Sequence, residues 1–195
     1  MRSPFLCLLL ALAFYPAAFA QSEANIALDL RPGLSDNSAL SGSTRGHFAA
    51  DNGTVRVKAP GVAAEIERQV FNLLNAERRS KGLPELEWND EVAAVARLHS
   101  HNMADGKFFS HRGSDGSMVD DRADRLGLGA WRVIGENIAF MRGYEDPAAL
   151  AVEKWMESTA HRKNLLGPNW KESAVGVAIT EDGTYYMTQV FLLRK

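Results

Sequence analysis

Apolar residues recur every three or four positions over two long stretches of the chain and predict two amphipathic helices. The first covers residues 62–81 and ends at Gly82, and the second runs from Asn89, a typical N-cap residue, to Gly106. The apolar stripe of the first helix is formed by Ile66, Val70, Leu73 and Leu74. That of the second is formed by Val92, Val95, Ala96, His99 and Met103. Each helix is therefore expected to bury one face against a core.

Two further helices are predicted from their start signals. Ser117 and Asp120 resemble a capping box, which would open a short helix that ends at Gly127. Asp146 followed by Pro147 combines a capping residue with proline at the first helical position. We therefore expect a helix over the segment DPAALAVEKWMES.

After the first helix, strand patterns appear only from residue 133 onward. Residues 133–140 form a short β-like run, and residues 174–180 and 184–193 flank the turn Glu181-Asp182-Gly183. An Asp-Gly pair between two apolar runs is a strong signal for a β-hairpin. Helices followed by an antiparallel hairpin indicate the α+β class, with a small antiparallel sheet covered by helices.

The N-terminus has the pattern of a secretory signal peptide over residues 1–20. Arg2 provides the positive end, residues 5–14 the apolar segment, and Ala18-Phe19-Ala20 the cleavage site. The apolar segment is too short to cross a membrane, and no other stretch approaches the roughly 20 apolar residues that a transmembrane helix needs. The chain is therefore expected to be exported, to the periplasm or the medium, with no transmembrane segment after signal cleavage.

Residues 21–60 are rich in Ser, Gly, Asn and Asp, and are interpreted as a flexible tether before a domain at residues 61–195. Within the tether, Thr54 to Val57 alternate and could form an edge strand. The only cysteine, Cys7, lies early in the predicted signal and not at its cleavage point, which argues against a lipoprotein. The mature chain therefore has no disulfide and depends on its core.

Charge and composition exclude one class of partner. The formal net charge is −2, and without Arg2 the exported chain has 21 basic and 24 acidic residues, a net charge of −3. No cluster of Lys and Arg is longer than a short run such as Arg78-Arg79. The sequence therefore lacks the basic surface that binding to nucleic acid requires.

Candidate chemistry rests on histidines and acids, because the zinc-protease, phosphate-loop and nucleophile-elbow motifs are absent. His111 lies in the Gly-rich segment FFSHRGSDG, where it is either a site residue or a structural one. Glu136 lies between Ile134 and Ile138 on one strand face. It is either on the exposed side of the strand or buried with a dedicated partner, because an unpaired buried carboxylate is costly.

The segment WMESTAHRKN places Glu157 four residues and Ser158 three residues before His161. On one continuous helix both would share the face of the histidine, as a solvated pair or as part of a site. His99 lies on an apolar stripe and is interpreted as a packed histidine, whereas His101 is expected to be solvated.

Five segments in order, LNAERRSKGLPELEWNDEVAAVARLHSHNM, FFSHRGSDG, GENIAF, WMESTAHRKNLL and VGVAITEDGTYYMTQVF, resemble the CAP superfamily, also called SCP-like extracellular proteins. The resemblance is greatest to its cysteine-free bacterial branch. It implies a three-layer α–β–α sandwich with a central antiparallel sheet and a cleft that holds two histidines and two acids. By matching motifs, the cleft residues are His111, Glu136 and His161. Ser158 stands where the second acid is expected, and Glu157 is offset from it by about 100° on a helix.

The resemblance leaves several functions open. The first is a cleft that binds a divalent cation such as Zn²⁺ through His111, His161 and Glu136, or a small-molecule, lipid-like or cell-envelope ligand, without an organic cofactor. The second is a hydrolase, in which Glu136 activates a metal-bound water or Ser158 and His161 act as nucleophile and base. The third is a structural or interaction domain.

Overall fold

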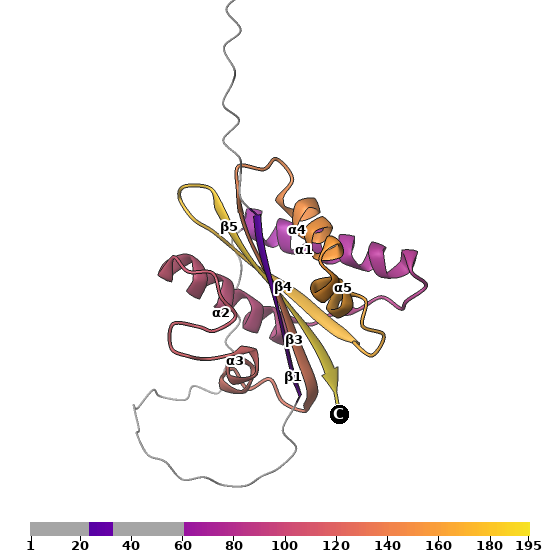
Figure 1. The fold of residues 1–195 in the computed structure, drawn as a ribbon. Coiled ribbons are helices and arrows are strands. Elements are labelled where there is room, and N and C mark those ends of the chain that lie inside the picture. Colours follow the sequence, from indigo (N-terminus) through magenta and orange to yellow (C-terminus); the bar gives the residue numbers. More distant parts are fainter. Residues whose placement is uncertain (1–23, 33–60) are drawn as a thin grey trace, which may run out of the picture.

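The computed structural model describes residues 24–32 and 61–195, which form three layers with a sheet between two groups of helices (Figure 1). The elements in chain order are β1 (Ala24–Pro32), α1 (Gly61–Ser80), β2 (Glu87–Trp88), α2 (Asp90–Gly106), α3 (Val119–Arg125), β3 (Trp131–Arg142), α4 (Pro147–Glu157), α5 (Thr159–Leu165), β4 (Glu172–Ile179) and β5 (Thr184–Arg194). The predicted α–β–α sandwich is confirmed.

The sheet has the strand order β1-β3-β5-β4-β2. The pairs β1–β3, β3–β5 and β5–β4 are antiparallel, as expected for the predicted sheet. Only the two-residue strand β2 differs, because it pairs with β4 in parallel. The Asp-Gly hairpin joins β4 to β5 as predicted, with Gly183 at a φ of 77° in its turn.

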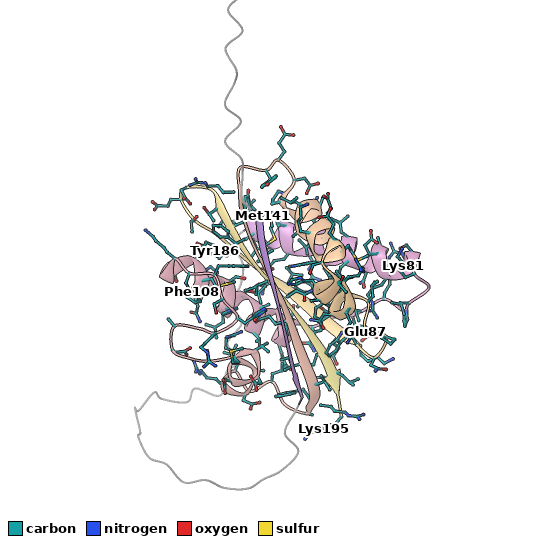
Figure 2. The ribbon with its side chains drawn as sticks, viewed as in Figure 1. Lys81, Glu87, Phe108, Met141, Tyr186 and Lys195 are labelled. Atoms are coloured by element: carbon teal, nitrogen blue, oxygen red, sulfur yellow. The ribbon has the colours of Figure 1, made fainter. Side chains whose placement is uncertain are left out.

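The two helical layers cover opposite faces of the sheet. Helices α1, α4 and α5 enclose one apolar cluster with alternate residues of the strands, among them Ala139 and Met141 of β3. Helices α2 and α3 pack on the other face with Ile134 of β3, and the C-terminal part of α2 continues this packing over Ile138. Figure 2 shows Phe108 and Tyr186 together beside α2. The alternation of β3 therefore decides which layer each of its side chains meets.

The helix starts follow the sequence signals with one exception. Asn89 caps α2 by accepting hydrogen bonds from the backbone of Glu91 and Val92, and Asp146 caps α4 in the same way. The capping box predicted at Ser117 is wrong. Helix α3 starts after Met118, whose backbone N–H donates to Asp121.

The helix predicted over DPAALAVEKWMES ends within one residue of its predicted end, and a second helix follows after a break at Ser158. Helix α4 ends at Glu157, Ser158 takes an extended conformation with a ψ of 122°, and α5 begins at Thr159. Four-residue spacing therefore does not bring Glu157 and His161 together, because they lie on different helices. The condition for a shared face, one continuous helix, is therefore not met.

The tether predicted for residues 21–60 is also wrong in part, because Ala24–Pro32 forms strand β1. The predicted strand at residues 54–57 and the predicted signal at residues 1–20 lie outside the described residues. Within the described part, none of the helices combines the length and the apolar character that a membrane crossing requires.

Buried Arg78 links the helices of one layer without any disulfide. It lies at the end of α1, and its guanidinium donates to the carbonyl oxygens of Pro84, Leu165 and Gly167. Because Arg78 is the donor to all three carbonyl oxygens, it holds the end of α5 and the segment after it against the end of α1.

Candidate functional site

The first half of the candidate site is built around the carboxylate of Glu136, which is fully buried on the α2 face of β3. His111 donates from Nδ1 to Oε1 at 2.7 Å, and Arg122 donates from its guanidinium to Oε2 at 2.7 Å. His99 Nε2 lies 3.9 Å from Oε1. Of the two readings left open for Glu136, the structure therefore supports a buried acid with dedicated partners.

Arg122 belongs to the cluster around Glu136, although it was not predicted from the sequence. It is fully buried on α3, and besides Glu136 its guanidinium donates to the carbonyl oxygens of His111 and Ser117. Arg122 thus fixes both the carboxylate and the loop that carries His111. A signal was present, since Val119, Arg122 and Ala123 share one stripe of the short helix.

The hydrogen bonds define the protonation of the cluster. Burial raises the pKa of Glu136, but the hydrogen bond from His111 and the charge of Arg122 outweigh it and hold the pKa below its usual value. An ionised carboxylate only accepts hydrogen bonds, so His111 carries its proton on Nδ1. In the neutral ring, the lone pair then lies on Nε2, a buried atom with no partner among the described residues. His111 therefore presents one oriented, unused nitrogen.

His99 supports the same cluster from α2. Its Nε2 lies 2.9 Å from the carbonyl oxygen of Ser110, so this nitrogen donates and Nδ1 carries the lone pair. Burial lowers the pKa of His99 to about 4, with Glu136 opposing the shift and Arg122 adding to it. The interpretation of His99 as a packed histidine is confirmed, and it also holds the segment that leads to His111.

We expect the free energy of unfolding to fall by about 2 kcal/mol between about pH 7 and pH 5 because of His99. Its pKa is about 4 in the folded chain and 6.5 when unperturbed, so the unfolded chain binds the proton first as the pH falls. Urea unfolding at several pH values in this range measures the slope of the free energy of unfolding against pH. His99→Gln should reduce this slope. The half-buried Asn102 on the same helix provides the control, since Asn102→Gln changes no titratable group and should keep the slope. An unchanged slope in His99→Gln would contradict the assignment.

The second half of the candidate site is the pair Ser158 and His161 on the other side of the sheet. His161 is buried, and its Nδ1 lies 2.6 Å from Ser158 Oγ. Ser158 stands at the junction of α4 and α5, so the helix break aims its hydroxyl at the histidine. Glu157 lies apart, exposed to solvent and hydrogen-bonded to Lys154 at 2.8 Å.

Consecutive residues of β3 hold the two halves. Glu136 faces α2 and α3, whereas the next residue, Asn137, faces α5, because strand side chains alternate. Asn137 Oδ1 accepts from Asn164 Nδ2 at 3.1 Å, and Asn137 Nδ2 lies 3.5 Å from the carbonyl oxygen of His161. The structure thus places His111 with Glu136 and His161 with Ser158, on opposite faces of β3.

Among the side chains of residues 61–195, no three His, Asp or Glu are grouped as a metal site. A hollow of about 1180 Å³ lies elsewhere, between the C-terminal end of α2 and the β4–β5 hairpin, with Phe140 and Tyr186 in its wall. It contains none of the residues that the motifs indicated.

Residues 71–191 match the family model of the CAP proteins, described as the cysteine-rich secretory protein family. The chain is a member of the CAP family. The resemblance of the five motifs to this family is thereby confirmed.

Two similar proteins come from Bacillus species. The chain is 33% identical over 143 residues to the Bacillus subtilis (strain 168) protein YkwD, covering 73% of this chain and 53% of YkwD. An extracellular protein containing an SCP domain from Bacillus anthracis has a TM-score of 0.58 and 31% identity, over 68% of this chain and 42% of that one. The chain therefore spans about half the length of these relatives or less.

A solved outer surface protein from Borrelia burgdorferi shares the fold. Its TM-score is 0.59 at 19% identity, and the match covers 67% of this chain and 94% of that one. The CAP fold of the described domain therefore accounts for nearly all of that protein.

Proposed function

We propose that this CAP protein is a binding module that acts outside the cytoplasm and holds a divalent cation at His111, alone or together with a small or lipid-like ligand. The observation that supports it most directly is Nε2 of His111, which is buried, has no hydrogen-bond partner among the described residues and is oriented by the bond from Nδ1 to Glu136. A carboxylate that holds one nitrogen of a histidine while the other binds metal is a common arrangement in metal sites.

The side chains around His111 fit this role, but they differ from the cation ligands predicted from the sequence. Both oxygens of Glu136 already accept hydrogen bonds, so Glu136 would orient His111 and not bind the cation itself. His161 lies on the opposite face of β3, so water or a bound ligand would supply the remaining positions in the arrangement that the structure shows. When bound, a cation such as Zn²⁺ would supply a Lewis acid to which an anionic group of the ligand attaches.

A location outside the cytoplasm is supported by two independent observations. The N-terminus has the signal-peptide pattern, and the similar Bacillus anthracis protein is described as extracellular. A domain without disulfides does not depend on an oxidising compartment for its stability, so the fold is compatible with either the periplasm or the medium.

Calorimetric titration of Zn²⁺ into residues 21–195 tests the cation site. Zn²⁺ should bind with measurable heat, and His111→Ala should weaken it about 100-fold or abolish it. His101→Ala, a change of the same size on α2 outside both halves of the site, should leave the affinity unchanged. Unfolding curves of each variant establish that the chain is folded.

Absence of heat in the wild-type chain, or equal affinity in wild type and His111→Ala, would overturn the cation proposal. The cluster of His111, Glu136 and Arg122 would then only fix the loop that carries His111 to the sheet. This outcome would favour the hypothesis of a structural or interaction domain.

Hydrolysis is a second candidate, favoured by one observation. Ser158 Oγ and His161 Nδ1 are at hydrogen-bonding distance, 2.6 Å, which is the geometry of a nucleophile with its base. An activated fluorophosphonate ester should then label the wild-type chain and not Ser158→Ala. Equal labelling of both chains, or of neither, would contradict catalysis by Ser158.

A further inference from the structure

Strand β1 covers the long edge of β3 over nine residues in continuous register. Within this pairing, Leu28 lies opposite Asn137 and Asp29 lies opposite Glu136, so the middle of β1 pairs with the two residues that hold the two halves of the site. In the strand order β1 is outermost, and β3 would form the edge of the sheet without it. An uncovered strand edge exposes a row of backbone donors and acceptors that another extended segment can pair with.

The same strand contacts both helical layers. Besides β3, it lies against α3, which carries Arg122, and against α5, which carries His161. Figure 1 shows β1 running along β3 between these two helices. Any route around the edge of the sheet from the His111 side to the His161 side therefore meets β1.

We propose that the edge of β3 is a binding site for an extended peptide, that residues 24–32 of this chain occupy it, and that this strand separates the two halves of the site until it is released. Addition of a strand to an open sheet edge is an established mode of peptide recognition, in which backbone hydrogen bonds provide the affinity. The consequence for the cation site rests on the proposed function, whereas the peptide site does not.

The position of β1 in the chain agrees with a detachable strand. It precedes residues 71–191, which contain the family match, and residues 33–60 separate it from α1. The segment ANIALDLRP has apolar residues at every second position, Ile26, Leu28 and Leu30, a spacing that is typical of β-strands. A segment tethered to its own binding site competes with peptides added in solution through its high effective concentration.

The double variant Leu28→Pro/Asp29→Pro in residues 21–195 tests the strand. Successive N–H groups of a strand point to opposite sides, so one of these two prolines removes a donor to β3. The amides of residues 133–141 that face β1 should then exchange hydrogen about tenfold faster or more. The control, Ser38→Pro/Ala39→Pro, changes two residues outside β1 and should leave this exchange unchanged.

A synthetic peptide with the sequence ANIALDLRP gives a readout that does not involve metal. It should bind the proline variant about tenfold more tightly than the wild-type chain, where the site is occupied. Equal exchange at β3 in both chains, or no binding of the peptide to the variant, would overturn the proposal. So would a wild-type dimer that the proline variant converts to monomer, because the strand would then come from a second copy.

Zn²⁺ titration separates this proposal from the cation site. Release of β1 should tighten Zn²⁺ binding about tenfold. Binding that is equal in the two chains would overturn the separating role of β1. Absence of heat in both chains would overturn the cation site and leave the peptide site to be judged by exchange and peptide binding alone.

A reversible lock provides a second variant if the prolines impair folding. Pro32 pairs with Val133 at the end of β1, and opposite residues of an antiparallel pair lie at distances that a disulfide can bridge. In the oxidised form of Pro32→Cys/Val133→Cys, the disulfide should hold β1 in place and exclude the peptide. After reduction with a phosphine, the peptide should bind about tenfold more tightly than to the oxidised form. Binding of the peptide to the oxidised form would overturn the proposal.

Discussion

Replacing Glu136 with glutamine is expected to lower the free energy of unfolding by about 3–5 kcal/mol. Glu136 and Arg122 are both fully buried and lie 2.7 Å apart, so the change leaves the guanidinium without a counter-charge in the protein interior. The other hydrogen bonds of Arg122 are to the carbonyl oxygens of His111 and Ser117, which carry no net charge to replace that of Glu136. Urea unfolding of the exported chain measures the loss.

The control for this result is Glu157→Gln, which removes an equally short ion pair at the surface. Lys154 and Glu157 lie 2.8 Å apart in solvent, so the loss should stay below about 1 kcal/mol. The double variant Arg122→Met/Glu136→Gln should lose less than the sum of the two single changes, because it removes both members of the pair. Strictly additive losses would show that the two charges are not coupled.

Gly176→Ala is expected to destabilise the chain by about 3 kcal/mol. Gly176 lies on β4 where α2 crosses the sheet, and a Cβ at this position would lie 2.6 Å from the Cα of Arg97. The obstacle is the backbone of α2, which can move only if the whole helix lifts from the sheet. Ser100, one turn further along α2, donates to the carbonyl oxygen of Gly176 at 2.9 Å and would be displaced with it.

Gly61→Ala provides the matched control for this substitution. A Cβ on Gly61 meets nothing within 4 Å, and helix α1 begins there, so its effect on the free energy of unfolding should stay within about 1 kcal/mol. Thermal or urea unfolding of both variants measures the difference. Equal stability of Gly176→Ala and the wild-type chain would show that α2 does not lie as close to β4 as the structure has it.

Local signals in the sequence predicted most of the elements, because each signal acts within a few residues. Asn89 and Asp146 cap their helices as expected, and Gly183 lies in the turn of the predicted hairpin. Strand β1 was missed since the composition around it is polar and rich in small residues, although Ile26 and Leu28 belong to an alternating pattern. Its pairing with β3 joins residues far apart in sequence, which no local pattern reveals.

The sequence predicted which residues belong to the candidate site, but not how they are placed relative to one another. Motifs pointed to His111, Glu136 and His161, but only the fold shows that the first two lie on one face of β3 and the third on the other. Arg122 escaped notice because an arginine on a short helix usually reaches solvent, and its burial depends on a carboxylate fourteen residues away. The helix break at Ser158 has no glycine or proline to mark it.

The placement of Glu136 and Asn137 on opposite faces limits how this site can change by insertion or deletion. One residue added to β3 before Glu136 would exchange the two side chains between the layers, because faces alternate along a strand. Both halves of the site would then fail at once. Variation in length among related chains should therefore spare this strand.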